Sequence, residues 1–396
     1  MPKMTVKDID VRGKRVLLRV DFNVPLDIKT GAISDDTRIR ASIPTIKYLI
    51  DHKARIVICS HLGRPSGKVV ESLRMAPVAK RLSQLINLPV NIASDCIGPE
   101  VESKVKSLRE GEILVLENVR FHPEEEEDDL GFAKKIAKLA DIYVNDAFAV
   151  SHRTHASTVG VAKYLPAVAG LLMKKELDIM EKLLHDSAHP LACLMGGAKV
   201  GDKMGLLQNI LKKIDILLIG GGMAITFLKV RGYEVGNSLT EDDKLDLAKE
   251  LLREAKEWNV PFLLPVDVVV AEEIKPGAQA KVVDLTNIPS SSYIVDIGPK
   301  SVELFCNELK KCRTVVWNGP MGIYEIPQFS HGTKAIANFL ATLDATTIIG
   351  GGSSAEIVQE MGLADKMSHV STGGGASLMF LEGVALPGVE VLLDKK

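Results

Sequence analysis

The sequence predicts an α/β fold in which parallel sheets are covered by helices. Short β-branched runs are apolar throughout rather than alternating, which indicates strands buried on both faces. Segments with helical periodicity separate these runs, as expected for right-handed crossovers between parallel strands. At 396 residues, the chain also exceeds one ordinary core. At about 150 residues per domain, two or three domains are expected.

The expected strands occur in both halves of the chain. In the first half they are 15–20, 54–60, 112–118 and 141–146. In the second half they are 191–196, 215–220, 262–270, 314–319, 346–351 and 368–374. The clearest helical segments are 76–86, 131–140 and 241–258. Residues 165–186 predict a long bridging helix, because Met173, Leu177, Met180 and Leu184 repeat at helical spacing. We place the domain boundary on that helix.

Composition is typical of a soluble globular protein, with 46% hydrophobic and 25% charged residues. The formal net charge of -2 gives no bias toward nucleic acid or anionic membrane. Five cysteines without a CxxC pair indicate reduced thiols in a cytosolic protein. The first residues show no apolar leader, and the longest uncharged apolar stretch, 216–228, is too short to span a bilayer. We therefore expect a cytoplasmic protein with no nucleic-acid or membrane partner.

Polar and basic residues follow the strands of the first half. In open α/β sheets, ligands bind beyond the carboxyl ends of the strands. The segments there are 21–25, 60–65, 118–120 and 146–153, and twelve of the fifteen arginines lie at or before Arg153. Guanidinium groups match carboxylate and phosphate oxygens, so this edge predicts an anion site. A turn, a helix cap or a surface ion pair remains the alternative for any single residue.

An acidic run, Glu124–Asp129, lies between an expected strand and an expected helix. Six carboxylates without apolar neighbours repel one another, so a solvated loop is the natural interpretation. A metal site is the less favoured alternative.

Glycines follow the strands of the second half, at 196–197, 220–222, 319, 350–352 and 373–375. Glycine lets backbone N–H groups approach a ligand, and a following helix N-terminus favours negative charge. The pattern predicts a nucleotide or another polyphosphate, although tight turns or close helix packing also require glycine. Gly350-x-Gly352-x-x-Ala355 matches a dinucleotide fingerprint only superficially, since it does not open a βαβ unit.

Lys199 and Lys203 are expected on the helix that follows Gly196–Gly197. At this spacing both ammonium groups would lie on one face near the helix N-terminus, where the dipole disfavours cations. An anion contacted by both would offset that cost. Two solvated surface lysines are the alternative.

Six motifs together resemble the phosphoglycerate kinase family, in the family's order: RVDFNVP (19–25), SHLGRP (60–65), LENVRF (116–121), GGAKVGDK (196–203), VWNGPMGIYE (316–325) and STGGGASL (371–378). The resemblance covers essentially the whole chain. It implies two Rossmann-like domains with parallel sheets facing across a hinged cleft. It also implies reversible transfer of the acyl phosphate of 1,3-bisphosphoglycerate to ADP, giving 3-phosphoglycerate and ATP.

The resemblance implies a domain plan and a set of site residues. A glycerate-binding domain would span 1–167, with 378–396 returning to it, followed by a bridging helix at 168–186 and a nucleotide-binding domain at 187–377. The implied substrate site consists of Asp21, Phe22, Asn23, Arg38, His61, Leu62, Gly63, Arg64, Arg120 and Arg153. The implied nucleotide site consists of Gly197, Lys203, Gly221, Gly222, Asn318, Glu325, Gly351, Gly352, Ser353 and Ser354. The implied catalytic residues are Arg38, Lys199, Gly374 and Gly375.

The implied chemistry needs positioned charge rather than a general base. The carboxylate that leaves from the acyl phosphate is weakly basic, so in-line positioning and charge neutralisation suffice. Because the implied donors lie in two domains, the resemblance implies closure of the cleft around the substrates. The enzyme is expected to be a monomer that uses Mg²⁺ bound with ADP or ATP.

Residues 348–358 depart from the family pattern. Ser353 stands where the family has an aspartate that helps to hold Mg²⁺, and a hydroxyl is a weaker ligand for a hard cation. Mg²⁺ is therefore expected on phosphate oxygens and water, with no protein residue assigned as a metal ligand. Ser353 and Glu356 also have the spacing of a capping box, with Ser353 at the N-cap.

Three rival functions remain. A nicotinamide-dependent dehydrogenase would rest on the glycine fingerprint, but Lys199, Lys203 and the arginines argue against it. A two-domain solute-binding protein would share the architecture and usually requires export. A kinase-fold protein without activity is kept open by Ser353 alone.

Overall fold

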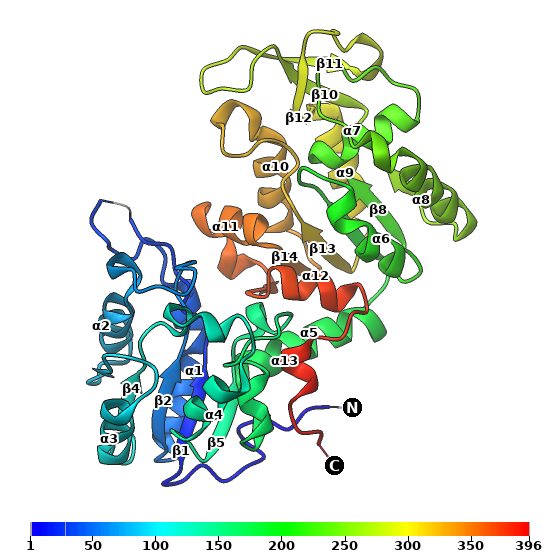
Figure 1. Cartoon of the computed structure of the whole chain (residues 1–396). Coiled ribbons are helices and arrows are strands. Elements are labelled where there is room, and N and C mark those ends of the chain that lie inside the picture. Colours follow the sequence, from blue (N-terminus) through cyan, green and yellow to red (C-terminus); the bar gives the residue numbers. More distant parts are fainter. Residues whose placement is uncertain (1, 28, 396) are drawn as a thin grey trace. The chain divides into compact units, whose positions relative to one another are not determined.

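The computed structural model describes residues 2–27 and 29–395. The chain divides into two compact units, Met1–Ile179 with Ala385–Lys396, and Met180–Val384. We call these unit 1 and unit 2, and describe each by itself (Figure 1).

Unit 1 is built on a six-stranded parallel sheet. The strands lie in the order β3-β4-β2-β1-β5-β6, and every pair is parallel. Their bounds are β1 Arg15–Arg19, β2 Arg55–Cys59, β3 Asn91–Ile92, β4 Ile113–Val115, β5 Ile142–Asn145 and β6 Ala167–Ala169. The four strands expected from the sequence are β1, β2, β4 and β5. β3, with two residues, gives little periodic signal. β6 lies in the segment expected to begin the bridging helix, which starts only at Leu171.

Helices alternate with the strands of unit 1. They are α1 Thr37–Asp51, α2 Ala76–Ile86, α3 Pro99–Ser107 and α4 Leu130–Ala137. The C-terminal segment, with α13 Pro387–Glu390, returns to this unit, where Gly388 N–H donates to Ser151 O at 2.8 Å. That return begins at Ala385 rather than at residue 378. α12, Gly375–Leu381, stays with unit 2 because the Asn209 side chain donates to Leu381 O.

One helix passes from unit 1 to unit 2. α5 spans Leu171–His185 and buries Met173, Leu177 and Met180. The division between the units falls inside this helix, at Ile179 and Met180.

Unit 2 contains a second six-stranded parallel sheet, in the order β15-β14-β13-β7-β8-β9. The strands are β7 Leu191–Met195, β8 Ile216–Ile219, β9 Phe262–Leu263, β13 Thr314–Asn318, β14 Thr346–Gly350 and β15 His369–Val370. The remaining helices are α6 Met204–Leu211, α7 Gly221–Val230, α8 Leu245–Glu257, α9 Pro299–Leu309, α10 His331–Leu340 and α11 Gly352–Glu360. The prediction of an α/β fold with parallel sheets is confirmed.

Part of the strand expected at 262–270 lies in a different sheet. β9 ends at Leu263, and β10, Asp267–Ala271, joins an antiparallel sheet between β11, Ala280–Asp284, and β12, Tyr293–Ile297. Pro265 separates the two strands and has no N–H to donate to a ladder, which explains the interruption. Apolar content alone does not distinguish these two environments.

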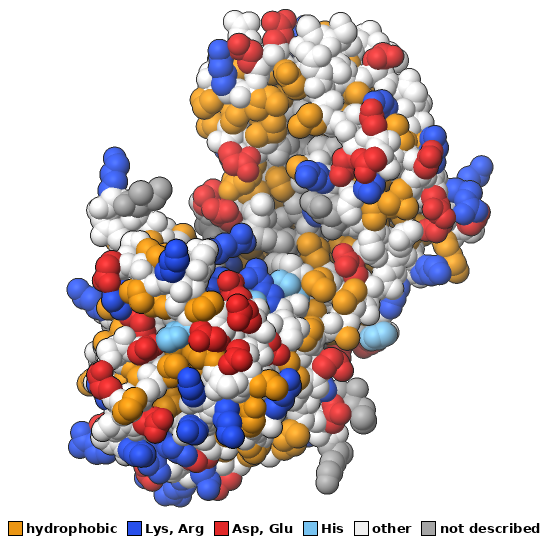
Figure 2. Space-filling model, in the orientation of Figure 1, with side chains coloured by type: hydrophobic (Ala, Val, Ile, Leu, Met, Phe, Trp, Pro, Cys, Tyr) orange, Lys and Arg blue, Asp and Glu red, His pale blue; other side chains and the backbone are white. Residues whose placement is uncertain are grey.

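The cores lie where the apolar runs predict. In unit 1, one cluster includes Leu18 of β1, Ile58 of β2 and Val144 of β5. In unit 2, one cluster surrounds Trp317 of β13, whose indole N–H donates to Gly319 O at 2.8 Å. On the face shown in Figure 2, acidic and basic side chains are interspersed, in keeping with the small net charge. Among the described residues, no helix is long and apolar enough to cross a membrane.

Candidate functional site

The polar residues that follow β1 and β2 meet at one edge of the unit 1 sheet. The Asn23 side-chain oxygen accepts from Gly63 N–H at 2.8 Å, which ties the two strand exits together. Asp21 Oδ1 accepts from Asn23 N–H at 3.1 Å and lies 4.0 Å from His61 Nδ1. Asn23 therefore holds the loop that carries His61, in addition to the substrate contact expected of it.

Arg38 stands in the first turn of α1 and pairs with Asp21. Its side chain remains 39% exposed, whereas that of Asp21 is buried. The carboxylate thus fixes one guanidinium nitrogen and leaves part of the cation open to solvent. Such an arrangement orients the guanidinium group and leaves its exposed part available to a ligand.

Arg120 lies beside the same loop. It is 3% exposed, and its Nη1 donates to Gly63 O at 2.9 Å. Its Nε lies 3.2 Å from Glu126 Oε1, outside hydrogen-bond geometry, and its buried Nη2 has no hydrogen-bond partner among the described residues. A buried unpaired donor is costly, so this atom is suited to an anionic ligand.

Asn118 connects the exits of β2 and β4. Its side-chain oxygen accepts from the N–H groups of Leu62 and Arg120, and its amide donates to Leu62 O at 2.7 Å. The sequence places Asn118 directly after a buried strand, which is the only signal that it offers for this role.

A network of buried polar groups is connected to the site. Arg19, the last residue of β1, is 1% exposed and donates through Nε to Ser157 Oγ at 2.8 Å. The Ser157 hydroxyl donates in turn to Glu125 Oε1 at 2.6 Å. Arg19 Nη2 also lies 3.4 Å from His61 Nδ1. The network joins the acidic segment to the predicted site.

The expectation of a solvated acidic loop at Glu124–Asp129 is therefore wrong for Glu125, which is fully buried. Asp129 is exposed and caps α4 by accepting from Phe132 N–H at 2.7 Å. Tertiary partners compensate the charge of Glu125, which charge patterning along the chain does not reveal.

The imidazoles in this region are held neutral. Burial, followed by the charges of Arg19 and Arg120, keeps the pKa of His61 well below its usual value. Burial and the same two arginines lower the pKa of His155 to about 4. Positive charge at neutral pH consequently resides on guanidinium groups, and an anion binding here would meet arginine rather than imidazolium.

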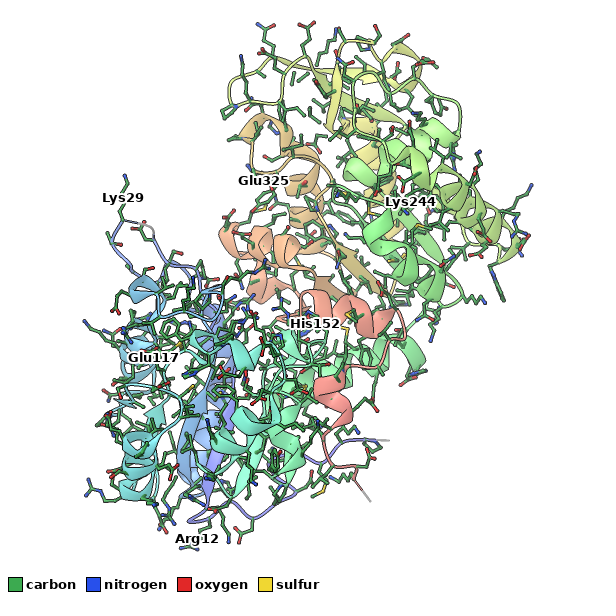
Figure 3. All side chains as sticks on the ribbon, viewed as in Figure 1. Arg12, Lys29, Glu117, His152, Lys244 and Glu325 are labelled. Carbon is green, nitrogen blue, oxygen red and sulfur yellow. The ribbon has the colours of Figure 1, made fainter. Side chains whose placement is uncertain are left out.

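The other predicted residues of unit 1 occupy different environments. Arg64 is exposed, whereas Arg153 is half-buried with its Nε 3.3 Å from Nε2 of His152, which is labelled in Figure 3. The side chains of Phe22 and Leu62 are buried in the core cluster. Only the backbone of these two residues could reach a ligand.

Several glycines that follow the strands of unit 2 are required by close packing. A Cβ added at Gly196 would lie 2.2 Å from Pro320 O, and one at Gly222 would lie 2.7 Å from Ala198 O. Gly197 N–H already donates to Pro320 O at 2.8 Å, and Gly221 N–H donates to Met321 O at 3.0 Å. These two N–H groups serve to join the exits of β7, β8 and β13. Close packing thus accounts for glycine at these positions.

The expectation that Lys199 and Lys203 share a helical face is wrong. Lys199 lies in an exposed irregular segment, and α6 does not begin until Met204. Lys203 ends a 3₁₀ turn and donates to Gly196 O at 2.6 Å and to Asn318 O at 3.2 Å. Glu241 accepts from the N–H groups of Val200 and Gly201, which favours this turn over a continuous helix.

Two helix starts in unit 2 are open. α11 begins at Gly352 and α12 at Gly375, and neither has a side-chain cap. A Cβ at Gly352 or at Gly374 would meet nothing within 4 Å. These starts therefore combine unhindered backbone with the positive end of a helix dipole, which suits phosphate.

The capping box expected at Ser353 is absent. Gly351, at φ +82°, is the N-cap of α11, so Ser353 lies inside the first turn and is exposed. Ser354 instead accepts from Gly319 N–H at 2.6 Å and is fully buried. It anchors α11 to the exit of β13 by a structural hydrogen bond.

Comparison with known proteins agrees with these motifs. The sequence model of the family described as "Phosphoglycerate kinase" matches residues 6–384. The chain belongs to the phosphoglycerate kinase family. It is 55% identical, over 100% of both chains, to proteins named phosphoglycerate kinase from Dictyoglomus turgidum and from Pelotomaculum thermopropionicum. It also matches the solved structure of phosphoglycerate kinase from Coxiella burnetii with a TM-score of 0.87, at 42% identity over 98% of each chain.

Membership of the phosphoglycerate kinase family makes Mg²⁺ with a nucleotide the expected cofactor, so we asked whether the residues fit it. Residues 350–355 contain no carboxylate. Their hydroxyls are those of exposed Ser353 and of Ser354, which already accepts a hydrogen bond. Mg²⁺ prefers carboxylate, phosphate and water oxygens. This turn therefore fits Mg²⁺ held on nucleotide phosphates and does not fit a protein-built metal site.

Asn318 and Glu325 stand at different depths after β13. Asn318 is buried, with its side chain close to Gly350 and Gly351, whereas Glu325 is exposed (Figure 3). An exposed carboxylate can accept hydrogen bonds from hydroxyl groups of a ligand.

Proposed function

We propose that this chain catalyses the reversible transfer of the acyl phosphate of 1,3-bisphosphoglycerate to ADP, giving 3-phosphoglycerate and ATP. The observation that carries the proposal is the guanidinium set of unit 1. It includes the buried, unpaired Nη2 of Arg120 and the half-open cation of Arg38. An anionic glycerate would supply the acceptor oxygens that these donors lack.

In this proposal, unit 1 binds the glycerate. Arg120 and Arg153, with exposed Arg64, provide charge for the phosphate and carboxylate groups. Asp21 and Asn23 fix Arg38 and the Gly63 loop by the contacts described above. Neutral His61 contributes hydrogen bonding rather than charge.

Unit 2 binds the nucleotide in the same proposal. The open starts at Gly351–Gly352 and Gly374–Gly375 donate backbone N–H groups to phosphates, and Glu325 accepts from the ribose hydroxyls. Lys203 acts by its charge and by holding Gly196 and Asn318 in place. Mg²⁺ carried on the nucleotide would neutralise phosphate charge when bound.

The reacting phosphoryl group would be stabilised by Arg38 and, from the other unit, by exposed Lys199. Neither residue needs to accept a proton, because the carboxylate of 3-phosphoglycerate attacks or leaves without one. This assignment requires the two units to approach during turnover, which would exclude water from the acyl phosphate. Small-angle scattering should then show compaction only with both substrates present, and identical curves would contradict closure.

The direct test is a coupled assay with 3-phosphoglycerate, Mg-ATP and an NADH-linked reporter of 1,3-bisphosphoglycerate. NADH oxidation that depends on both substrates is expected. Its absence from folded protein would overturn the proposal. We further propose that the protein is cytoplasmic and monomeric. Sedimentation at several protein concentrations can test the monomeric state.

A further inference from the structure

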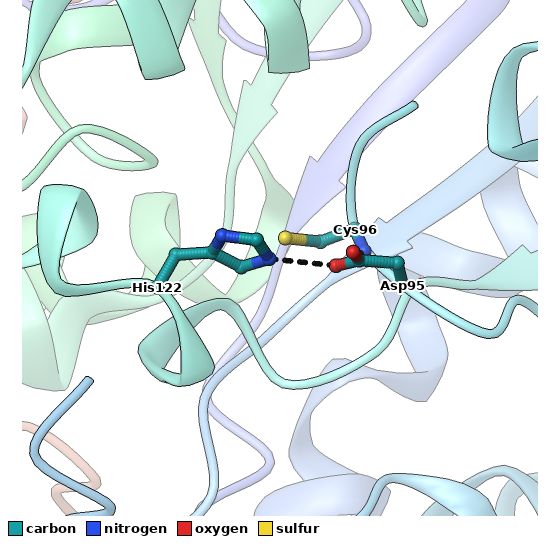
Figure 4. A group of neighbouring side chains, drawn as sticks. All are labelled: Asp95, Cys96 and His122. Carbon is teal, nitrogen blue, oxygen red and sulfur yellow. Dashed lines mark hydrogen bonds and ion pairs between the residues drawn. The ribbon is translucent and has the colours of Figure 1, made fainter. Parts of the chain in front are cut away.

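A second candidate ligand site lies in unit 1, apart from the groups assigned above. Asp95, Cys96 and His122 converge there (Figure 4). Their ligand atoms, a carboxylate oxygen, Sγ and an imidazole nitrogen, all lie within 4.8 Å of one another. Asp95 and Cys96 follow β3, and His122 follows the 3₁₀ turn Val119–Phe121 after β4.

The cluster is held in place by contacts outside itself. Asp95 O accepts from Glu117 N–H at 3.3 Å, and Ala93 N–H donates to Val115 O at 2.9 Å, which fixes the two loops against each other. The His122 ring packs on Phe132 with centroids 5.1 Å apart. These contacts hold the two loops that carry the donors next to each other.

The Asp95 carboxylate links the other two residues. Asp95 Oδ1 accepts from Cys96 N–H at 2.6 Å and lies 2.7 Å from His122 Nε2. Cys96 is fully buried, whereas the side chains of Asp95 and His122 are 47% and 24% exposed. The carboxylate and the imidazole are thus accessible to an ion from solvent, whereas the thiol is covered.

We propose that Asp95, Cys96 and His122 form a binding site for Zn²⁺. A mixed sulfur, nitrogen and oxygen set suits a borderline cation, whereas Mg²⁺ prefers oxygen alone. Tetrahedral Zn²⁺ bonds of about 2.0–2.3 Å place neighbouring ligand atoms about 3.3–3.7 Å apart. Shifts of about 1 Å in the donor atoms reach that geometry, and the exposed Asp95 and His122 side chains can make them. Cys96 binds as thiolate and releases its proton to solvent, and water completes the coordination.

The site would brace a segment that matters to the glycerate site. His122 lies two residues after Arg120 and three before Glu125, both of which face the arginine network. Zn²⁺ would link this segment to the loop after β3. Bound Zn²⁺ should consequently raise the unfolding temperature of the protein.

Co²⁺ is the probe for the test, because a cobalt thiolate gives a near-ultraviolet charge-transfer band. The full-length protein should bind one Co²⁺ with that band, and Zn²⁺ should displace it. Cys96→Ser should remove the band, whereas Cys306→Ser should retain it because half-buried Cys306 belongs to no such cluster among the described residues. No band in the wild type, or an unchanged band in Cys96→Ser, would overturn the proposal.

Asp95→Asn and His122→Gln provide the test if Cys96→Ser does not fold, as judged by circular dichroism. Each should weaken Zn²⁺ binding at least about tenfold, since even partners outside the coordination sphere have effects of that size. Calorimetric titration with Zn²⁺ measures this. Wild-type affinity in both variants would contradict the site.

Discussion

The two units present ligand-binding groups in opposite ways. Unit 1 uses charged side chains, with Arg120 buried beside Gly63 and Arg19 connected to Glu125 through the Ser157 hydroxyl. Unit 2 uses backbone, at the uncapped starts of α11 and α12. Both groups lie at the carboxyl ends of parallel strands, so the same architecture supports two kinds of anion site.

The difference shows where each kind of site is vulnerable. Buried guanidinium groups need compensating charge, so unit 1 depends on a partner such as Glu125 from a distant segment. Backbone donors need no compensation but require room, so unit 2 depends on positions without a Cβ. The side-chain site of unit 1 should lose its function when a charge is removed. The backbone site of unit 2 should lose its function when side-chain volume is added.

The largest effect should follow from removing the half-open charge of unit 1. We expect Arg38→Ala to lower kcat about 10²–10³-fold, because one preorganised donor to a transition state is lost. Affinity for ADP should be nearly unchanged. The coupled assay and calorimetric titration with ADP measure the two quantities. Arg40→Ala is the matched control, since Arg40 is two residues further along α1, is exposed and pairs with Asp36. Near-normal turnover of Arg38→Ala would refute its role.

Neutralising the buried acid of unit 1 should be the next largest effect. Glu125→Gln leaves Arg19 without its compensating charge, and we expect a loss of about 3 kcal/mol in stability. Hydrogen exchange measured on peptides from β1 and β5 reports unit 1 specifically. Glu127→Gln, at an exposed position of the same acidic run, should exchange like the wild type. Equal protection from hydrogen exchange in Glu125→Gln and Glu127→Gln would show that the Glu125 carboxylate does not stabilise unit 1.

A buried acid in unit 2 provides a contrast through pH. Burial raises the pKa of Asp296 to about 7, although backbone N–H groups including that of Gly332 oppose the shift. The unfolded chain loses this proton near its ordinary pKa of 3.8, whereas the folded chain keeps it to about 7. Stability should therefore fall as pH rises from about 5 to about 7, by about 2.7 kcal/mol at most.

Tryptophan fluorescence measures that decline, because both tryptophans, Trp258 and Trp317, lie in unit 2. Asp296→Asn should flatten the pH dependence. Asp284→Asn removes an exposed acid that pairs with Lys300 and should retain it. A slope that is the same in Asp296→Asn and in the wild type would exclude Asp296 as its source.

Adding volume should distinguish the two kinds of glycine in unit 2. Gly196→Ala would place a Cβ 2.2 Å from Pro320 O, and we expect a loss of about 2 kcal/mol in denaturant unfolding. Gly352→Ala meets nothing within 4 Å, so stability should hold while affinity for ADP falls. Destabilisation by both substitutions, or unchanged ADP affinity in Gly352→Ala, would contradict the distinction.

The smallest effect should come from adding a side-chain charge to the backbone site. Ser353→Asp introduces a carboxylate at an exposed position in the first turn of α11, where it can help hold Mg²⁺ on the nucleotide. The Mg²⁺ concentration for half-maximal activity should fall a few-fold, as steady-state assays can measure. Ser353→Asn is the neutral control. An unchanged or higher requirement in Ser353→Asp would refute the hypothesis.

Several features of the fold and the site could be predicted from the chain alone. The apolar runs identified most strands of the two parallel sheets, and the residues after them separated a polar edge from a glycine-rich one. Two predictions from the sequence, among others, were wrong. Lys199 and Lys203 matched a helical spacing, yet Glu241 and the carbonyl of Gly196 fix a different turn. The strand at 262–270 divides between two sheets, which its apolar content alone does not reveal.

The sequence by itself determined the α/β class, the order of the motifs and the family, because these depend on local periodicity and on residue types at fixed spacing. Tertiary structure alone decided which groups are partners. Arg19 meets Ser157 across 138 positions, and Ser354 meets Gly319 across 35. It also decided which glycines are packed and which are open. Such contacts depend on how segments that are distant in the sequence approach in space. The local residue pattern does not contain that information.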